Sequence, residues 1–377
     1  MRILIKGGNA VLGDCQKYTL TDILTEDGII VKELTAPPDV TINAGGKYIL
    51  PGLIDIHTHG SVGINYSKDK IFDTALSFSA SQGVTSVVPT VGVRPFDDIL
   101  NAIKNIVLNA KRSPIGASVE GIHIEGPFVS PKKIGAMNQC DIPCTVENFN
   151  RIYDNTEGYL KIMTIAPEAP GALDVIREGA SKSIRMSIGH TDASYEEGLA
   201  GIRRGASGAT HIFNAMRRFT HRDPGVGAAI LTEPSVTCEV ICDMVHLAPA
   251  TVKLVKATKG LDGMILVSDS GMITGLGDGD YEVDGKIRSV KGGISRNSEG
   301  TIAGSTFTMS DGARNLIELG FTHCDIAKIG ALNPAKAIGA DGYIGSLDTG
   351  KRADIIIVDE KFNVENVIIK GKLFPTQ

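Results

Sequence analysis

Short apolar runs alternate with longer amphipathic stretches through the middle of the chain. Eight of these runs are rich in β-branched residues, and each is followed by a segment long enough to hold a helix. This alternation is typical of repeated β–α units, whose strands lie parallel in one sheet. Because eight units close a barrel, we predict an α/β fold with a TIM-type (β/α)8 barrel over residues 49–345. The runs read YILPGLIDIHTH, VTSVVPT, ASVEGIHIEG, LKIMTIAPE, IRMSIGHT, ASGATHIF, VTCEVICDMVH and GMILVSDS.

The two ends of the chain show a different pattern, with short strand-like runs separated by Gly and Pro turns. Neither residues 1–48 nor residues 346–377 could bury a core alone. We therefore expect them to pair in one small β-sandwich domain, into which the barrel is inserted. A third irregular region, residues 275–305, carries Asp-Gly and Gly-Gly turn signals suited to a hairpin.

Composition narrows the class of protein. The 377 residues are 42% hydrophobic and 21% charged, as in a folded soluble protein. A net charge of −5 argues against a general polyanion-binding surface, so we expect no nucleic-acid partner. No apolar run is long enough for a signal peptide or a membrane span, and the six cysteines form no Cys-x-x-Cys pair. We expect a cytoplasmic protein with free thiols and no membrane partner.

Residues that could bind a metal or carry a proton gather at the ends of the predicted strands. In a (β/α)8 barrel these ends form the active-site face. One histidine at a strand end is commonly only a hydrogen-bonding residue, but several on one face favour a metal site. His123, two residues before Glu125, is expected either to support the metal ligands or to pack in the core, and the role of Asp55, two residues before His57, is open in the same way. His221 and His323 are given no role. The candidates are His57 and His59 on the first strand, Glu125 on the third, His190 on the fifth, His211 on the sixth and Asp269 on the eighth.

Two long motifs give the chain a family resemblance. PGLIDIHTHG near the start and NPAKAIGADGYIGSLDTGKRADIIIVD near the end resemble the amidohydrolase superfamily. Between them, IHIEGPF, SIGHTDA, THIFNAM, RDPG, LVSDSG and IAGSTFTM are similar to the successive motifs of the N-acetylglucosamine-6-phosphate deacetylase family, in the same order. The resemblance extends over essentially the whole chain.

The resemblance implies a metal-dependent hydrolysis. Glu125, His190 and His211 match the residues that bind one divalent metal in the family, and His57 and His59 suit a second. The fourth strand ends in TIAPE without a lysine, so Glu125 would have to bridge two metals. We expect one or two metals per chain, zinc first and iron, manganese or cobalt as alternatives. Asp269 is the expected catalytic residue, which takes a proton from the attacking water and passes it to the leaving amine.

The family pattern also implies substrate contacts. Arg222 and His246 are expected to bind phosphate, with His246 acting across the subunit interface of a homodimer. The family usually has a histidine at the position of Met137, and this departure leaves the sugar or acyl preference open. The expected contacts are Ala136, Met137, Asn214, Ala215, Arg222, His246, Ile302, Ala303 and Gly304.

These implications combine into one expected activity, the deacetylation of an N-acetyl-hexosamine 6-phosphate to the amino-sugar phosphate and acetate. N-acetylglucosamine 6-phosphate is the expected substrate, and its galacto epimer is the nearest alternative. Cyclic amide hydrolysis or deamination is a further alternative, because a barrel alone does not determine the reaction. The last alternative is a protein that keeps the fold but has no catalytic activity, although every expected metal ligand and Asp269 are present.

Overall fold

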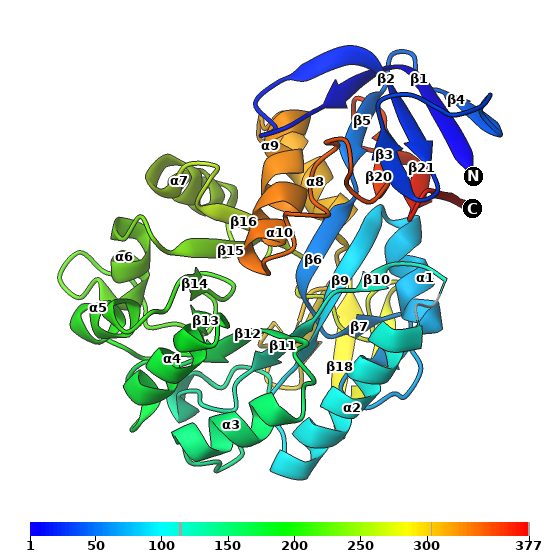
Figure 1. Ribbon diagram of the computed structural model, residues 1–377. Coiled ribbons are helices and arrows are strands. Elements are labelled where there is room, and N and C mark those ends of the chain that lie inside the picture. Colours follow the sequence, from blue (N-terminus) through cyan, green and yellow to red (C-terminus); the bar gives the residue numbers. More distant parts are fainter. Residues whose placement is uncertain (113–114, 303, 376–377) are drawn as a thin grey trace.

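The computed structural model describes residues 1–112, 115–302 and 304–375, and Figure 1 shows their arrangement. Eight parallel strands form the barrel that the sequence predicts. Each of the eight apolar runs supplies one strand, so that prediction is confirmed. The strands are β6 (Leu53–Thr58), β9 (Val84–Val91), β11 (Ile122–Glu125), β12 (Leu160–Ile165), β13 (Arg185–Ile188), β14 (Gly208–Ala209), β15 (Thr237–Ile241) and β16 (Met264–Val267). A short strand, β10 (Ser118–Val119), also pairs with β9.

Backbone contacts bring the first and last barrel strands together. The N–H of Asp269 donates to the carbonyl of His57 at 3.0 Å, and the N–H of His59 donates to the carbonyl of Ser270 at 2.7 Å. Thr58 and Ser270 form a parallel bridge at the same place. The barrel is therefore nearly closed, and residues just beyond β6 and β16 become neighbours.

Helices follow the barrel strands because their sequences carry one apolar face. In α2 this face packs into the core through Ile99, Ile103 and Ile106. Side chains also define the helix starts: Ser194 and Glu197 form a capping box at α5. The helices are α1 (Asp73–Ser81), α2 (Phe96–Arg112), α3 (Val146–Asp154), α4 (Ala172–Ser181), α5 (Tyr195–Arg203), α6 (Gly225–Thr232), α7 (Pro249–Lys259), α8 (Met309–Glu318), α9 (His323–Ala327) and α10 (Asn333–Ala337), with a 3-10 turn at Pro131–Lys133 and a π-helical turn at Lys328–Leu332.

Both ends of the chain contribute to a second sheet of eight strands, seen beside the two termini in Figure 1. β1 pairs with β2 along one edge and with β4 and then β5 along the other. Isoleucines from the β1–β2–β3 arm and from the β5–β20–β21 arm meet in one apolar cluster. The strands are β1 (Arg2–Val11), β2 (Tyr18–Glu26), β3 (Ile29–Val31), β4 (Val40–Asn43), β5 (Tyr48–Pro51), β20 (Ile355–Val358), β21 (Val364–Ile369) and β22 (Lys372–Phe374).

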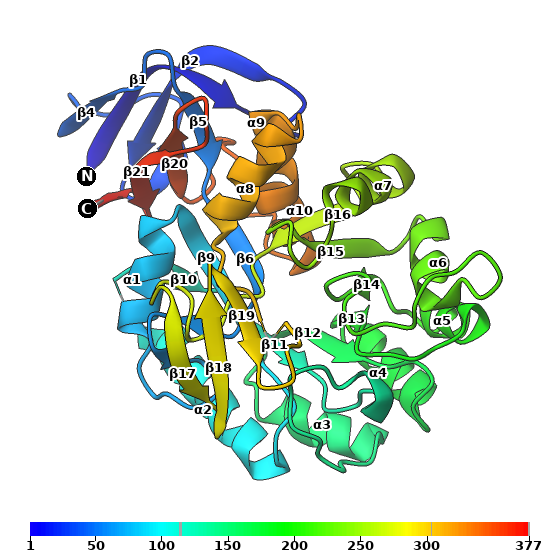
Figure 2. The same cartoon turned by 180° about the vertical axis from the view of Figure 1, so that it is seen from behind.

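The region after the last barrel strand forms three antiparallel strands rather than a single hairpin. They are β17 (Gly279–Val283), β18 (Lys286–Lys291) and β19 (Ile294–Asn297), which Figure 2 shows as a separate yellow sheet. The Asp284-Gly285 and Gly292-Gly293 turns each have two residues at positive φ, as tight two-residue hairpin turns require. A further short ribbon pairs β7 (Gly60–Ser61) with β8 (Ile64–Asn65).

None of the helices within the described residues is long and apolar enough to cross a membrane.

Candidate active site

The candidate ligands lie together where barrel strands end. His57 and Glu125 are the last or nearly last residues of β6 and β11, and His190, His211 and Asp269 follow β13, β14 and β16. His190, His211 and Asp269 have positive φ angles of 48°, 29° and 48°. Residues other than glycine rarely adopt this region, and such conformations are frequent at functional sites.

The Glu125 carboxylate is the centre of the group. Its Oε1 atom lies 3.0 Å from Nε2 of His190, 3.1 Å from Nε2 of His211 and 3.4 Å from Nε2 of His57. Its Oε2 atom lies 3.3 Å from Nε2 of His59. Four imidazoles from three strands thus surround one buried carboxylate.

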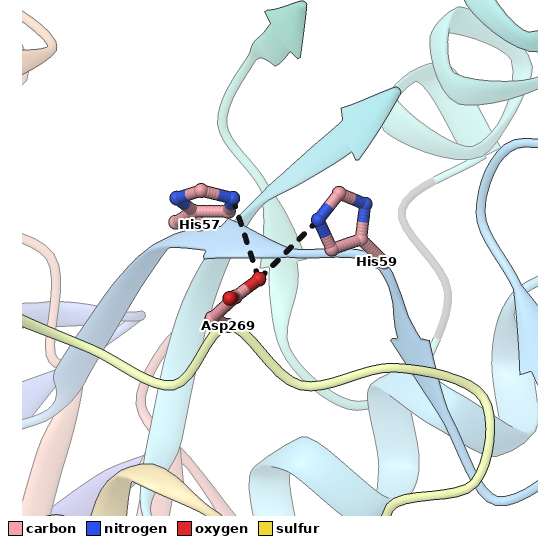
Figure 3. A group of neighbouring side chains, drawn as sticks. All are labelled: His57, His59 and Asp269. Atoms are coloured by element: carbon pink, nitrogen blue, oxygen red, sulfur yellow. Dashed lines mark ion pairs between the residues drawn. The ribbon is translucent and has the colours of Figure 1, made fainter. Parts of the chain in front are cut away.

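Asp269 faces the first-strand histidines. Its Oδ1 atom lies 3.5 Å from Nε2 of His57 and 3.4 Å from Nε2 of His59. Figure 3 shows the imidazoles of His57, on β6, and His59, just after it, turned toward this carboxylate, which comes from the segment after β16. The near closure of the barrel between β6 and β16 therefore places Asp269 beside His57 and His59.

The donor set fits a divalent metal. Nδ1 of His190 lies 2.8 Å from the carbonyl oxygen of Lys133, so this nitrogen donates its hydrogen there. In a neutral ring, Nε2 then presents a lone pair to Glu125 at 3.0 Å, and two acceptors this close repel unless a cation lies between them. Nε2 of His57 is also buried without a hydrogen-bond partner. Imidazole nitrogens and carboxylate oxygens are ligands that zinc and similar metals prefer.

The described residues contain three groups of potential ligands, and two of them consist of predicted site residues. The ligand atoms of Glu125, His190 and His211 lie within 4.8 Å of one another, and so do those of His57, His59 and Asp269. Glu125 contacts both groups through its two oxygens. Each of these groups could hold a divalent metal.

The charges of the site are mutually dependent. Burial alone would raise the pKa of the Glu125 and Asp269 carboxyls, but the neighbouring His57 holds both pKa values well below their usual ranges. Burial would lower the pKa of His59, yet Asp269 and Glu125 raise it to about 9. Positive charge is therefore needed between these carboxylates, either as protons on the imidazoles or as a metal cation.

The third group consists of His57, His123 and Glu239, and Glu239 was not identified from the sequence. Glu239 lies in the middle of β15, fully buried, and its Oε2 atom is 2.8 Å from Nδ1 of His57. Glu239 does not stand at a strand end, so its position in the sequence did not indicate a site residue. The available signal was a charged residue inside an otherwise apolar strand, where burial requires a partner.

His123 and Asp55 are buried one strand repeat before two candidate ligands, Glu125 on β11 and His57 on β6. Nε2 of His123 is 2.8 Å from the Thr164 hydroxyl, and burial lowers the pKa of His123 to about 3, so the ring is neutral. Asp55 accepts a hydrogen bond from the Ser268 hydroxyl, and burial raises its pKa to about 6.

The site opens into a cavity of about 720 Å³. Arg222 is exposed on the loop before α6 and does not line the cavity, and Ala303 lies outside the described residues. The other predicted substrate contacts all line it: Ala136, Met137, Asn214, Ala215, His246, Ile302 and Gly304.

His246 lies in the cavity of its own chain. Its Nδ1 atom is 2.6 Å from Oδ2 of Asp243; burial would lower the pKa of His246, but this contact raises it. His246 thus lines the cavity of its own chain, and the cross-subunit role expected for it stays a prediction.

Met137 lies close to the metal ligands. Its sulfur accepts a hydrogen bond from the N–H of Val93 at 3.3 Å. The lack of a side chain at Gly92 leaves room for this approach, since a Cβ atom there would lie 3.2 Å from the Met137 sulfur and 3.9 Å from Oε2 of Glu125. An apolar thioether thus faces the cavity beside Glu125.

Cationic side chains that the sequence did not single out also line the cavity. Asp284, at the β17–β18 turn, pairs with Lys68 at 2.8 Å. The cations come from separate loops and from the three-stranded sheet, so only the folded chain brings them together: Lys68, Arg94, Lys286, Arg288 and Arg296.

Known proteins match the chain over most of its length. The profile of the Amidohydrolase family matches residues 48–374. N-acetylglucosamine-6-phosphate deacetylase from Bacillus subtilis (strain 168) is 38% identical, over 91% of this chain and 86% of that protein. N-acetylgalactosamine-6-phosphate deacetylase from Escherichia coli O157:H7 is 31% identical, over 92% and 93%. The structure of a Mycobacterium smegmatis N-acetyl-D-glucosamine-6-phosphate deacetylase variant, in complex with N-acetyl-D-glucosamine-6-phosphate, is similar with a TM-score of 0.90 at 28% identity, over 99% of both chains.

Proposed function

The chain belongs to the amidohydrolase family, and from this premise we propose that it removes the acetyl group from N-acetylglucosamine 6-phosphate. Relatives that carry this activity in their names match nearly the whole chain, both in sequence and in structure. The products are acetate and the free amino-sugar phosphate. A reaction of this kind needs an activated water, a proton carrier and a site for the phosphate.

The residues around Glu125 support the first requirement. Glu125, His190 and His211 would hold one divalent metal, and His57 with His59 a second, zinc being the metal we propose. A bound metal lowers the pKa of water toward neutrality and polarises the amide carbonyl. The side chains themselves orient the ligand atoms and exclude bulk water, since the ligands other than His59 and Asp269 are buried.

Asp269 is proposed as the proton carrier. Its low pKa keeps the carboxylate ionised, so it can accept a proton from the water that attacks the carbonyl carbon. The same carboxyl group then donates this proton to the amine nitrogen as the C–N bond breaks. One group thus acts as base and then as acid.

The cavity wall supports a phosphorylated substrate. His246 lines the cavity with its pKa raised, and five Lys and Arg side chains share the lining. Cations in a confined site bind phosphate oxygens through charge-assisted hydrogen bonds. An unphosphorylated sugar would bring no anion to this part of the lining, so we expect it to bind more weakly.

The observation that carries the proposal is the approach of Asp269 to the histidines of β6, on the same cavity as Glu125, His190 and His211. The test is acetate release from N-acetylated hexosamines with and without a 6-phosphate, using protein of known metal content. Turnover of N-acetylglucosamine 6-phosphate well above that of the unphosphorylated sugar is expected. Ammonia release without acetate would instead indicate deamination.

A second candidate substrate is N-acetylgalactosamine 6-phosphate. The E. coli relative named for this sugar and the apolar Met137 beside the site favour it. Met137 cannot donate the hydrogen bond that a histidine would offer. We predict that Met137→His shifts the kcat/KM ratio of the two epimers toward the gluco sugar. The shift should correspond to the free energy of one hydrogen bond, about 0.5–1.5 kcal/mol. An unchanged ratio, in an enzyme that already rejects the galacto epimer, would give Met137 no part in selectivity.

We further propose a homodimer and a cytoplasmic location. Arg222 is exposed and does not line the cavity of its own chain, and we propose that it contacts the phosphate bound to a neighbouring subunit. All six cysteines are free, as suits a reducing compartment.

A further inference from the structure

Glu239 is a buried carboxylate to which the reaction outlined above gives no part. It lies in β15 with its side chain fully buried, on the same strand face as Ile241. Its Oε2 atom accepts a hydrogen bond from the backbone N–H of His211 at 3.2 Å and lies 2.8 Å from Nδ1 of His57. One oxygen therefore contacts two of the candidate metal ligands, His57 on β6 and His211 after β14.

These contacts determine which ring nitrogen of His57 carries the hydrogen. The N–H of His211 can only donate, so Oε2 of Glu239 acts as an acceptor there. An ionised carboxylate has no hydrogen to donate, and two N–H groups directed at one oxygen suit this charged form. Oε2 is thus an acceptor for His57 as well, and Nδ1 of His57 must donate.

The consequence appears at the other nitrogen of the ring. With the hydrogen on Nδ1, Nε2 of a neutral His57 presents its lone pair. This atom is buried without a hydrogen-bond partner, 3.4 Å from Glu125 and 3.5 Å from Asp269. A nitrogen lone pair that faces two carboxylates is suited to coordinate a metal cation together with them.

We propose that Glu239 is a positioning residue that fixes the tautomer of His57, and thereby sets the affinity of the metal site formed by His57, His59 and Asp269. Carboxylates that hold the second nitrogen of a metal-bound histidine commonly act in this way. The inference rests on the metal centre of the proposed function and on neither the sugar nor the acyl group.

The test is metal binding by Glu239→Gln. Glutamine keeps the size of the side chain, but its amide can donate to Nδ1 and so leave the hydrogen on Nε2. Titration with Co²⁺, followed by visible absorption and chelator competition, should show the first ion bound as in wild type. The second ion should bind about 10- to 100-fold more weakly. Two ions bound with wild-type affinities would overturn the proposal.

Asp55→Asn is the matched control. Asp55 is another buried carboxyl in the barrel, and it contacts the backbone N–H of His57 but not the ring. If this variant weakens the second ion as much as Glu239→Gln does, the effect reflects loss of a buried charge, and the proposal fails.

A double-mutant comparison separates positioning from a merely structural role. Adding Glu239→Gln to His57→Ala should leave Co²⁺ affinity unchanged, because the ring that Glu239 orients is already gone. A further loss would mean that Glu239 acts through His211 instead, against the proposal.

A measurement on wild type does not depend on the variants folding. In zinc-loaded protein with ¹⁵N-labelled histidine, His57 should show a protonated Nδ1 and a metal-shifted Nε2. The opposite assignment would refute the proposal. These metal readouts do not involve turnover, so a failed deacetylation assay would overturn the proposed function and leave them intact.

Discussion

Asp269 combines two properties at the scale of the single residue. It lies 3.4 Å from Nε2 of His59, and it adopts a positive φ that aspartate tolerates better than most residues. Its backbone N–H is held by the carbonyl of His57. The side chain is therefore fixed at the mouth of the barrel, next to the proposed metal centre.

We predict that Asp269→Asn folds and retains the metal of the Glu125 site but loses turnover. An amide has nearly the same shape as a carboxylate, but it cannot accept and return a proton. The loss in kcat should be about 10²- to 10⁴-fold, as is typical for a general acid–base group. A near-normal kcat, measured beside metal content, would point to another base in the cavity.

The two groups of ligands should respond differently to substitution. His190→Ala or His211→Ala removes a ligand from the group around Glu125, so both metal retention and turnover should be lost. His57→Ala or His59→Ala should lower metal content toward one per chain and leave residual activity. Metal analysis after exhaustive dialysis distinguishes the two groups, and full activity of chelator-treated, metal-free wild type would contradict both expectations.

At the scale of the element, the three-stranded sheet β17–β19 connects fold to specificity. It brings Lys286, Arg288 and Arg296 to the cavity, and its Asp284 turn pairs with Lys68 on the barrel side. The pair is partly exposed, so its contribution is modest. It nevertheless joins the sheet to the wall that would face an anionic substrate.

Asp284→Asn should raise KM for the phosphorylated substrate by no more than about fivefold, with kcat unchanged, as expected for loss of a surface ion pair worth at most about 1 kcal/mol. Asp280→Asn is the control, because Asp280 lies on the same sheet and accepts a hydrogen bond from the Ser289 hydroxyl, but is not among the described residues that line the cavity. Equal increases in KM for the two variants would mean that loss of any charge on this sheet weakens substrate binding, and the Asp284–Lys68 pair would have no special part.

At the scale of the whole molecule, the small sheet joins the two ends of the chain. β5 enters the barrel directly through β6, and β20 returns beside β5, with Ile356 opposite Leu50. The exposed Arg222 lies on the barrel, before α6, outside the cavity of its own chain. In the proposed homodimer, Arg222 of one subunit would complete the phosphate site of the other.

Mixing inactive variants tests this arrangement. Arg222→Ala and Asp269→Asn subunits should each be poorly active alone, and dissociating and reassociating them together should restore activity. One site of the mixed dimer then has an intact Asp269 and an intact Arg222 from the other subunit. No recovery in a verified mixed dimer would place Arg222 outside the phosphate site. A monomer in sedimentation would exclude the homodimer itself.

Local patterns in the sequence determined the elements and much of the candidate site. Short apolar runs rich in β-branched residues predicted all eight barrel strands, because such a run is a local feature of neighbouring residues. His57, His190 and Asp269 stand at the ends of such runs. This position predicted that their side chains meet, because parallel strands end on one face of a barrel. The turns at Asp284-Gly285 and Gly292-Gly293 were also readable, although their pairing into three strands was not.

Only the tertiary structure decided which distant residues meet. Glu239 and His57 are 182 positions apart, and no local pattern links a mid-strand carboxylate to one imidazole among eight. The cationic wall of the cavity and the place of His246 inside it likewise depend on how separate loops pack. Closure of the barrel and docking of the three-stranded sheet set these distances, because both depend on contacts between segments far apart along the chain.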